Sequence, residues 1–493
     1  LEEQGGIVVE VNAAPGLRMH LAPSVGVPRP VGEAIVDMMF EPGNNGRIPI
    51  VAVTGVNGKT TTTRFIAHLL KGTGRRVGMT CTDGIYFEDR RVDHDDCAGP
   101  SSARRVLMNP NIDVAVFETA RGGILRAGLG FDQCDVAVVT NIGDGDHLGL
   151  HDIHTPEDLA KVKRTIVDVV ARDTGTAVLN AADPLVANMA QYSRGKVLFF
   201  AIDGQHPVIV QHRSVGGRAV FVREQTIILA EGDHETPLTT LDHIPLTHHG
   251  RISFEVENTL AALGAAWALG LSKETIVARA ESFAADMSKT PGRFNILEIK
   301  GAMVIIDYGH NAHALRAMIE AINTFPQQRR TAVYSTAGDR RDCDMLLMGQ
   351  LLGDAFDRVV LYEDHYVRGR VEGEIINLFR QGVAQGTRTR QVEAIQGAVK
   401  SVEHALNTVQ PGELMLIQAD AIDETVECVR RYVEALAGPS HAAEVEAITA
   451  VVEAHARASK KELDAPTKPS KTHVSNELCI GVMAESPVGA KAG

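Results

Sequence analysis

Aromatic side chains are scarce in this chain of 493 residues, where they make up 4% of the sequence and include a single Trp. That scarcity argues against a stacking platform for single-stranded nucleic acid. Basic residues are also in the minority, with 49 Lys and Arg against 62 Asp and Glu and a formal net charge of −13. This balance argues against a general nucleic-acid binder, although it is compatible with a local basic cleft for a small anion. We therefore expect no nucleic-acid partner.

Paired cysteines and long apolar runs are missing as well. None of the six cysteines lies within a few residues of another, so the sequence holds no CxxC zinc or redox pair. No apolar run approaches the roughly 18 to 20 residues that a membrane-spanning helix needs. We recognise no secretory segment, and we expect a cytoplasmic protein with reduced thiols and no membrane partner.

Alternating strand-like and helix-like segments predict a central α/β domain over residues 46–290. Such alternation favours a parallel sheet covered by helices on both faces. Residues 206–235 alternate in short pieces and predict an antiparallel insertion or extension. The strands are expected at Ile48–Thr54, Ile112–Glu118, Asp135–Thr140 and Thr176–Asn180. The helices are expected at Thr60–Leu70, Pro156–Ala171, Pro184–Tyr192, Glu257–Leu269 and Lys273–Ala285.

A second α/β series over residues 291–438 predicts a smaller, Rossmann-like C-terminal domain with five strands and five helices in a doubly wound arrangement. Its strands are expected at Asn295–Ile299, Ala302–Asp307, Thr331–Ser335, Arg358–Tyr362 and Glu413–Ile417. Its helices are expected at Ala312–Thr324, Met345–Phe356, Glu372–Gln381, Ala394–Asn407 and Asp423–Leu436.

The two ends of the chain differ from this pattern. Residues 1–45 contain an expected strand at Ile7–Val11 and an expected helix around Val31–Met39, which are too few elements for a domain. We expect the remnant of a domain whose N-terminal part is missing, followed by a linker. Residues 439–493 have too little apolar surface to offset their ordering entropy, so we expect a disordered tail.

The strongest chemical signal is a glycine-containing loop between a strand and a helix, Thr54-Gly55-Val56-Asn57-Gly58-Lys59-Thr60-Thr61. Glycines let the backbone approach phosphate oxygens, and the N–H groups at a helix start favour an anion. Lys59 supplies a point charge, and the Thr60 hydroxyl can ligate Mg²⁺. An ordinary Gly-rich turn is the alternative. Because the loop is two residues shorter than the common GxxxxGK[ST] form, a generic NTPase is not the best match.

Three further polar segments follow an expected strand or lie on an expected helix. Glu118 ends a strand, where a carboxylate can hold a metal in the ligand crevice or can cap the next helix. His147 closes the segment Asn141-Ile-Gly-Asp-Gly-Asp-His after another strand and suits metal or phosphate chemistry, whereas a lone surface His is the ordinary interpretation. Lys161 and Lys163 lie on a helix, where a solvated charged face is usual.

Taken together, these segments resemble the central domain of the Mur ligases, ATP-dependent amide-forming enzymes that include folylpolyglutamate synthetase. The short phosphate loop, the strand-end Glu, the Asn-to-His segment and a Lys 14 to 16 residues later occur in the family's order. The resemblance implies ATP and Mg²⁺ as cofactors, with one Mg²⁺ on Thr60 and Glu118. It implies a second Mg²⁺ on His147 and a carbamoylated lysine, which we take to be Lys163, with Lys161 as the alternative.

Downstream motifs extend the resemblance over about residues 47 to 436. Asn258 resembles the family's adenine-side Asn, Asp307 of Asp-Tyr-Gly-His-Asn its ribose-contacting Asp, and Arg340 of Gly-Asp-Arg-Arg-Asp its Arg near the phosphates. The nucleotide-binding residues so implied are Thr54, Gly55, Asn57, Gly58, Lys59, Thr60, Thr61, Asn258 and Asp307. The catalytic residues so implied are Lys59, His147, Lys163 and Arg340.

Two local sequences narrow the resemblance, Glu118-Thr-Ala-Arg-Gly-Gly-Ile-Leu-Arg126 and Asp144-Gly-Asp-His-Leu-Gly149. They are similar to the cyanophycin synthetase family, in which an ATP-grasp domain precedes a Mur-type half. Glu10 and Asn12 look like the Mg²⁺ ligands on the last strand of such an ATP-grasp domain.

This narrower resemblance implies an ATP-dependent ligase that adds L-arginine to the β-carboxyl of a poly-aspartate backbone through an acyl phosphate. The mostly missing ATP-grasp part would add L-aspartate. The implied partners are a cyanophycin polymer or primer and the two amino acids, and we expect a homo-oligomer.

Two alternatives stay open at this point. One is another Mur-type ligase, such as a folylpolyglutamate or muramyl-peptide synthetase, and the other is a non-catalytic P-loop nucleotide-binding protein. The residues that select arginine are also open: Glu363 and Asp364 are candidates, and a solvated loop is an equally good interpretation of them.

Overall fold

The computed structural model describes residues 14, 16–40, 42–284, 286–327, 329–364 and 367–437. Its main compact unit is Ile48–Pro439, and a second unit includes Leu1–Arg47. The described helices of the second unit are α1 (Arg18–Leu21) and α2 (Val31–Met39), and α2 confirms the helix expected there. The expected strand Ile7–Val11, the metal candidates Glu10 and Asn12, and the expected tail 439–493 lie outside the described residues.

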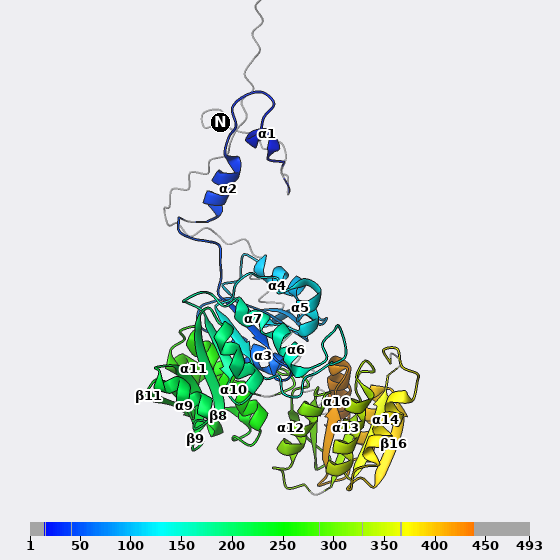
Figure 1. Ribbon diagram of the computed structural model, residues 1–493. Coiled ribbons are helices and arrows are strands. Elements are labelled where there is room, and N and C mark those ends of the chain that lie inside the picture. The colour runs from blue at the N-terminus through cyan, green and yellow to red at the C-terminus, as the bar shows by residue number, and fades with distance from the viewer. Residues whose placement is uncertain are drawn as a thin grey trace, which may run out of the picture. The chain divides into compact units, whose positions relative to one another are not determined.

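A large mixed sheet forms the first half of the main unit (Figure 1). Its eleven strands, counted over the described residues, run in the order β11-β10-β9-β8-β7-β6-β1-β5-β2-β3-β4. The pairs from β2 through β5, β1, β6, β7 and β8 to β9 are all parallel. The strands on the phosphate-loop side are β1 (Ile50–Thr54), β2 (Val77–Cys81), β3 (Gly84–Phe87), β4 (Arg90–Asp93), β5 (Val114–Glu118) and β6 (Val136–Val139). The others are β7 (Thr176–Asn180), β8 (Lys196–Asp203), β9 (Arg218–Arg223), β10 (Thr226–Glu231) and β11 (His234–Thr240).

Helices cover both faces of this sheet, as the fully buried strand β1 requires. One apolar core joins the sheet to α3, α10 and α11, and a second joins its other face to α4, α7, α8 and α9. The helices of this half are α3 (Lys59–Leu70), α4 (Pro100–Leu107), α5 (Arg121–Ala127), α6 (Pro156–Lys163), α7 (Thr165–Asp168), α8 (Pro184–Ala187), α9 (Pro207–Ser214), α10 (Ser253–Ala268) and α11 (Lys273–Ala280). Short 3₁₀ turns occupy Asn188–Tyr192, Leu241–His243 and Pro245–Thr247.

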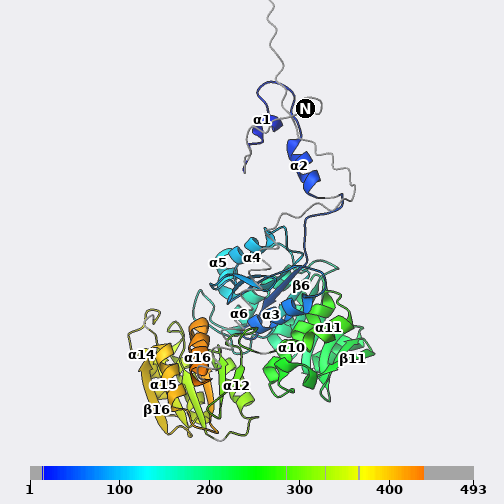
Figure 2. The same cartoon turned by 180° about the vertical axis from the view of Figure 1, so that it is seen from behind.

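A six-stranded sheet forms the second half, in the order β12-β13-β17-β14-β15-β16 (Figure 2). Helices α12, α13 and α14 pack on one face, and α15 and α16 pack on the other. The strands are β12 (Asn295–Ile299), β13 (Ala302–Asp307), β14 (Arg330–Tyr334), β15 (Arg358–Glu363), β16 (Gln391–Gln396) and β17 (Leu414–Gln418). The helices are α12 (Ala312–Ile322), α13 (Asp342–Ala355), α14 (Glu374–Val383), α15 (Ala398–Thr408) and α16 (Ile422–Ala437).

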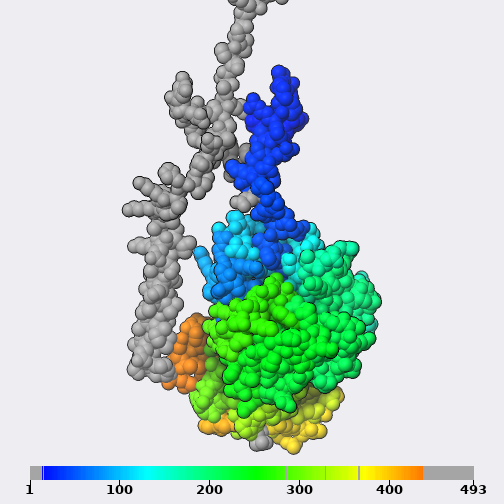
Figure 3. Space-filling model, turned by 90° about the vertical axis from the view of Figure 1, so that its left-hand side faces the viewer, coloured from blue at the N-terminus to red at the C-terminus, as the bar shows by residue number. Residues whose placement is uncertain are grey.

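The structure confirms the expected fold class, and it corrects several elements. The antiparallel extension expected within 206–235 is confirmed, because β10 and β11 extend the main sheet beyond β9, but helix α9 stands at its start where short extended pieces were expected. This part of the chain is green in Figure 3. The expected helix Pro156–Ala171 is divided into α6 and α7. The second sheet has six described strands and not five, because Gln391–Gln396 pairs in parallel with β15 where a helix was expected from Ala394.

Among the described residues, no helix combines the length and the low polarity needed to cross a lipid bilayer.

Candidate functional site

The phosphate-type loop joins the buried strand β1 to α3, and two of its positions accept only glycine. Gly58 has φ of +80° at the helix N-cap, and a Cβ there would lie 2.0 Å from Oδ1 of Asn258. A Cβ on Gly55 would lie 1.9 Å from Oγ1 of Thr140. The backbone therefore passes close to two other segments of the site, which a side chain at either position would prevent.

Hydrogen bonds from the end of β6 fix the shape of this loop. Oδ1 of Asn141 accepts from the Asn57 N–H at 2.9 Å, and the Asn141 carbonyl accepts from the Val56 N–H at 2.8 Å. Oγ1 of Thr140 donates to the Asn57 carbonyl at 2.6 Å. The amide Nδ2 of Asn311, just before α12, donates to Oδ1 of Asn57 at 2.9 Å, so the loop also touches the second half of the unit.

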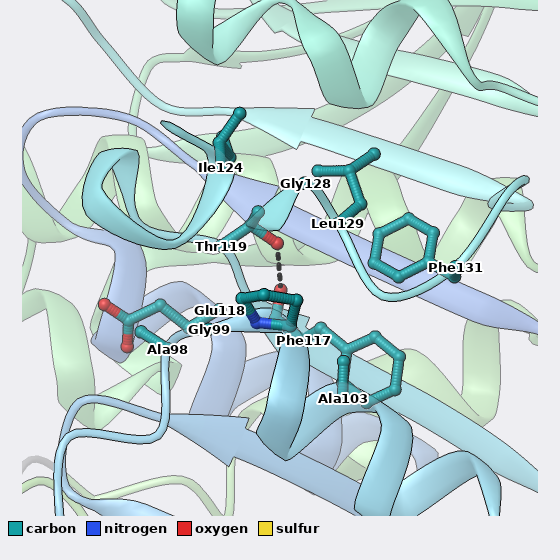
Figure 4. A pocket seen from close by; sticks show the side chains of 11 residues that line it. Ala98, Gly99, Ala103, Phe117, Glu118, Thr119, Ile124, Gly128, Leu129 and Phe131 are labelled. Carbon is teal, nitrogen blue, oxygen red and sulfur yellow. Dashed lines mark hydrogen bonds between the residues drawn. The ribbon is translucent and has the colours of Figure 1, made fainter. Parts of the chain in front are cut away.

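Glu118 ends β5 with its carboxylate beside the start of α3. The Thr60 hydroxyl donates to Oε2 at 2.9 Å, and the Thr82 hydroxyl donates to Oε1 at 2.8 Å. Behind it, the rings of Phe117 and Phe131 stack at 5.7 Å in a small apolar pocket without space for a water molecule. Figure 4 shows the Glu118 carboxylate directed away from these rings. Apolar packing thus holds the end of β5 so that its carboxylate meets Thr60.

The two candidate lysines of α6 have opposite environments. The Lys163 side chain is buried, and its Nζ donates to the Gly55 carbonyl at 2.5 Å. Burial, with Lys59 as a second cause, holds the pKa of Lys163 well below its ordinary value. Lys161 is 69% exposed and pairs with Asp158 at 3.2 Å. Of the two, Lys163 lies at the phosphate-type loop, and Lys161 faces solvent.

His147 lies in a polar cluster that spans the two halves of the unit. Asp146, His147 and His310 bring one potential ligand atom each to within 4.8 Å of one another. Arg340 forms a buried ion pair with Asp146, and its Nε donates to Thr336 at 2.8 Å. Although burial opposes ionisation, this guanidinium holds the pKa of Asp146 well below its usual range. Burial lowers the pKa of His147 to about 4, so that its imidazole is neutral at pH 7.

Asn258 and Asp307 complete the set of predicted nucleotide-binding residues in the site. Nδ2 of Asn258 donates to Oε2 of the buried Glu255 at 2.9 Å. Asp307 accepts from the N–H groups of Phe294 at 2.8 Å and Gly309 at 2.6 Å. These contacts fix both side chains in the free protein.

A cleft of about 650 Å³ connects these groups. The motifs meet in this cleft, although most of them are far apart in the sequence. The sequence-predicted residues that line it are Gly55, Asn57, Gly58, Lys59, Thr60, Thr61, Glu118, His147, Lys163, Asn258 and Asp307.

Two predicted residues stand behind the cleft and not in its lining. Oγ1 of Thr54 donates to the Thr119 carbonyl at 2.7 Å at the buried end of β1. Arg340 is 4% exposed and reaches the lining through Asp146. Its Nη2 is buried without a hydrogen-bond partner among the described residues.

Other polar residues of the cleft were not predicted from the sequence. Thr82 follows β2, a strand that the alternation of Val77-Gly-Met-Thr-Cys could have indicated. Arg121 lines the cleft and donates to the His147 carbonyl at 2.7 Å. Arg293 lies between Thr60 and Asp83, at 3.3 Å from each, and no sequence motif marks it.

Glu363 and Asp364 do not form a solvated loop. Glu363 is 1% exposed at the end of β15, and Asp364 accepts from the Ala398 N–H at 2.9 Å.

The arrangement fits a nucleoside triphosphate and a hard divalent cation. The glycine-only loop offers backbone N–H groups at a helix start, next to Lys59. Thr60 and Glu118 supply the hydroxyl and carboxylate oxygens that Mg²⁺ prefers. The neutral imidazole of His147 offers a nitrogen ligand nearby.

Comparison with known families agrees with this geometry. The Mur ligase middle domain matches residues 53–266, and the glutamate ligase domain of Mur ligases matches residues 292–420. The chain belongs to the Mur ligase family. Its large sheet with the phosphate-type loop is the middle domain, and its smaller sheet is the C-terminal domain.

Relatives named cyanophycin synthetase show strong similarity. The protein from Synechocystis sp. is 42% identical over 430 residues, which are 87% of this chain and 49% of the relative. The one from Geminocystis herdmanii is 41% identical over 432 residues, 88% of this chain and 49% of the relative. The chain is thus a homologue of cyanophycin synthetases, and it spans about half the length of the curated relatives it matches.

Solved structures share the fold at lower identity. Escherichia coli FolC in complex with DHPP and ADP superposes with a TM-score of 0.57 at 19% identity, over 80% of this chain and 90% of that one. A pseudomurein peptide ligase type C from Methanothermus fervidus gives 0.56 at 18% identity, over 81% of each chain. Both confirm the Mur-type fold.

Proposed function

We propose that this chain is the Mur-type half of a cyanophycin synthetase and that it adds L-arginine to the β-carboxyl groups of a poly-aspartate backbone. The observation that carries the proposal is the meeting of Gly58, Lys59, Glu118, His147 and Lys163 in one cleft. The similarity to proteins named cyanophycin synthetase supports the choice of substrate.

The reaction has two chemical steps. An oxygen of the polymer's β-carboxylate attacks the γ-phosphorus of ATP, which forms an acyl phosphate and releases ADP. The neutral α-amine of arginine then attacks the acyl carbon, and inorganic phosphate leaves as the amide forms. The α-ammonium of arginine loses two protons overall, so the site must accept them or pass them to water.

The chain's own residues serve these steps mainly by charge and position. The loop N–H groups and Lys59 bind the terminal phosphates, and Arg340, which Asp146 holds in place, adds positive charge behind the same region. Asn258 and Asp307 orient the base and the ribose. Thr60 and Glu118 would hold one Mg²⁺, and His147 and modified Lys163 would hold a second. Both ions would neutralise charge on the transferred phosphoryl group.

Lys163 is suited to modification because its amine is buried and only weakly basic. A neutral amine adds to the carbon of CO₂ and loses one proton to give a carbamate. This converts a position where an ammonium would repel Mg²⁺ and Lys59 into an anionic ligand. Repulsion from Lys59 also disfavours the ammonium form of Lys163 and so favours its modification.

The N-terminal residues fit the same proposal. We assign residues 1–45 to the end of an ATP-grasp domain that adds L-aspartate, with Glu10 and Asn12 as its Mg²⁺ ligands, and residues 46–290 and 291–438 to the two Mur-type domains. In the full-length enzyme, Glu10→Ala should stop aspartate addition and spare arginine addition to a preformed acceptor. Equal loss of both reactions in a folded variant would contradict two separate sites.

ADP release in the presence of a β-aspartyl polymer, with each amino acid offered in turn, tests the proposed substrates. Dependence on arginine supports the proposal. Dependence on glutamate would indicate a folylpolyglutamate-type ligase, and turnover independent of any amino acid would indicate a nucleotide-binding protein of another kind.

A further inference from the structure

Three side chains from the two halves of the unit bring their ligand atoms together in the cleft. Asp146 and His147 follow β6, and His310 follows β13. Oδ2 of Asp146 lies 3.7 Å from Nε2 of His147 and 3.8 Å from Nε2 of His310. Among the described residues, no second group of three His, Cys, Asp or Glu side chains brings its ligand atoms this close together.

These separations suit a single metal ion. Zinc binds imidazole nitrogen and carboxylate oxygen at about 2.0 to 2.2 Å in tetrahedral geometry, which places two of its ligand atoms about 3.3 to 3.6 Å apart. The two distances in the structure are longer by only a few tenths of an ångström. Small side-chain rotations close that difference, so the backbone already presents the three ligands correctly.

Neighbouring charged groups hold the ligands and leave these atoms free. Arg340 pairs with Oδ1 of Asp146, so Oδ2 is the oxygen that faces the two imidazoles. Oδ2 of Asp339 lies 3.8 Å from Nδ1 of His147, at the nitrogen that does not face Asp146. Oδ1 of Asp339 is buried without a hydrogen-bond partner among the described residues. A carboxylate at the second ring nitrogen of a His is the usual support of a metal-binding imidazole.

Two imidazole nitrogens distinguish this group from the oxygen-rich sites that Mg²⁺ prefers. Mg²⁺ favours octahedral coordination by oxygen, whereas zinc accepts two imidazoles and one carboxylate and keeps a fourth position for water. The side chain of His147 is 29% exposed and that of His310 is 16% exposed. An ion can therefore reach the group, and a water molecule can complete its coordination.

We propose that Asp146, His147 and His310 form a zinc site that joins the two halves of the unit across the cleft. The inference goes beyond the proposed function, because it requires neither a nucleotide nor a polymer. His147 is also the nitrogen ligand proposed for the second Mg²⁺, so bound zinc should inhibit the ligation.

Calorimetric titration of the metal-free chain with Zn²⁺, in excess Mg²⁺, tests the site. Loss of a residue that only supports a metal ligand lowers affinity roughly 10- to 100-fold, so His310→Gln should lower zinc affinity about 100-fold or more. Asp339→Ala should lower it about ten-fold. His249→Ala is the matched control and should leave it unchanged, because His249 is an exposed His beside Asp242 and has no third ligand nearby.

X-ray absorption by the zinc-loaded, unaltered protein gives a second measurement, which applies even if His310→Gln does not fold. It should show imidazole nitrogen and carboxylate oxygen around the zinc and no sulfur. Absence of zinc binding in excess Mg²⁺, undiminished affinity in folded His310→Gln, or a sulfur ligand would overturn the inference. None of these measurements uses ATP or the polymer, so their failure is distinct from failure of the proposed function.

Discussion

Replacement of Lys163 tests whether this residue bears a carbamate or is an ordinary buried lysine. The side chain is 4% exposed, and its Nζ donates to the Gly55 carbonyl at 2.5 Å. A carbamate there would act on the transferred phosphoryl group through Mg²⁺, and electrostatic contributions of this kind are worth about 2.7 to 4 kcal/mol. Lys163→Ala should therefore lower kcat for arginine addition by roughly 10² to 10³.

The assay is ADP release with a β-aspartyl acceptor and arginine, alongside native mass spectrometry of the intact protein. The unaltered protein should carry the added mass of one CO₂, and the Lys163→Ala variant should lack it. Lys163→Met keeps most of the side-chain volume, so an equal loss of activity in this variant shows that the loss does not come from a cavity. Short carboxylic acids should partly restore the Lys163→Ala variant by supplying the missing carboxylate.

Lys161→Ala is the control on the same helix, and it should lose little activity because Lys161 is 69% exposed. The reasoning is refuted if Lys161→Ala is the inactive variant, since the modified lysine is then the other one. It is also refuted if neither variant affects arginine addition.

Three further predictions concern the same cleft. Lys59→Ala should leave the circular dichroism spectrum unchanged and lower ligation by roughly 10² to 10³, whereas unimpaired turnover would contradict its phosphate role. Gly58→Ala should weaken ADP binding in calorimetry far more than Gly72→Ala, because both have φ near +80° but a Cβ meets Asn258 only at Gly58; equal effects would show that backbone strain alone matters. Burial raises the pKa of Glu255 to about 8, above its unfolded value, so this residue's stabilisation is complete below about pH 4.5 and is lost as pH rises toward 8. Thermal melts should therefore show Glu255→Gln gaining stability relative to the unaltered protein from pH 5.5 to 8.5, by up to roughly 3 to 5 kcal/mol, and a constant difference would contradict the raised pKa.

The elements nearest the site are the most predictable from sequence. The run Ile50–Thr54 is buried at every position, and a loop with two glycines and a lysine directly after such a strand is typical of phosphate binding. The strands Thr176–Asn180 and Asn295–Ile299 have the predicted bounds because both are short apolar runs between turn formers.

Other elements depend on partners that local sequence does not show. Half of the residues of the edge strand β16 are polar, and its pairing with β15 decides its conformation over the helical tendency from Ala394 onward. The strand β2 contains Gly78, which weakens its strand signal, although a Cβ there would lie 2.4 Å from Val106 and the packing requires glycine.

The site is predictable in outline because its motifs lie at the carboxyl ends of parallel strands, which meet at one edge of a sheet. The preference for Lys163 over Lys161 rests on resemblance in the sequence, and burial in the structure distinguishes them. Arg293 could not be found from sequence, because a single basic residue in no motif reaches the cleft only through the fold. Arg121 stands in the segment Glu118–Arg126, but the segment alone assigns it no role.

The central claim is that this chain joins arginine to an aspartyl polymer at the expense of ATP. The most direct measurement is ADP release by the purified chain with a β-aspartyl polymer and arginine, compared with each other amino acid in turn and with no amino acid. The account predicts release that requires both the polymer and arginine, together with incorporation of labelled arginine into the polymer. Release that proceeds equally with another amino acid, or without one, would contradict it.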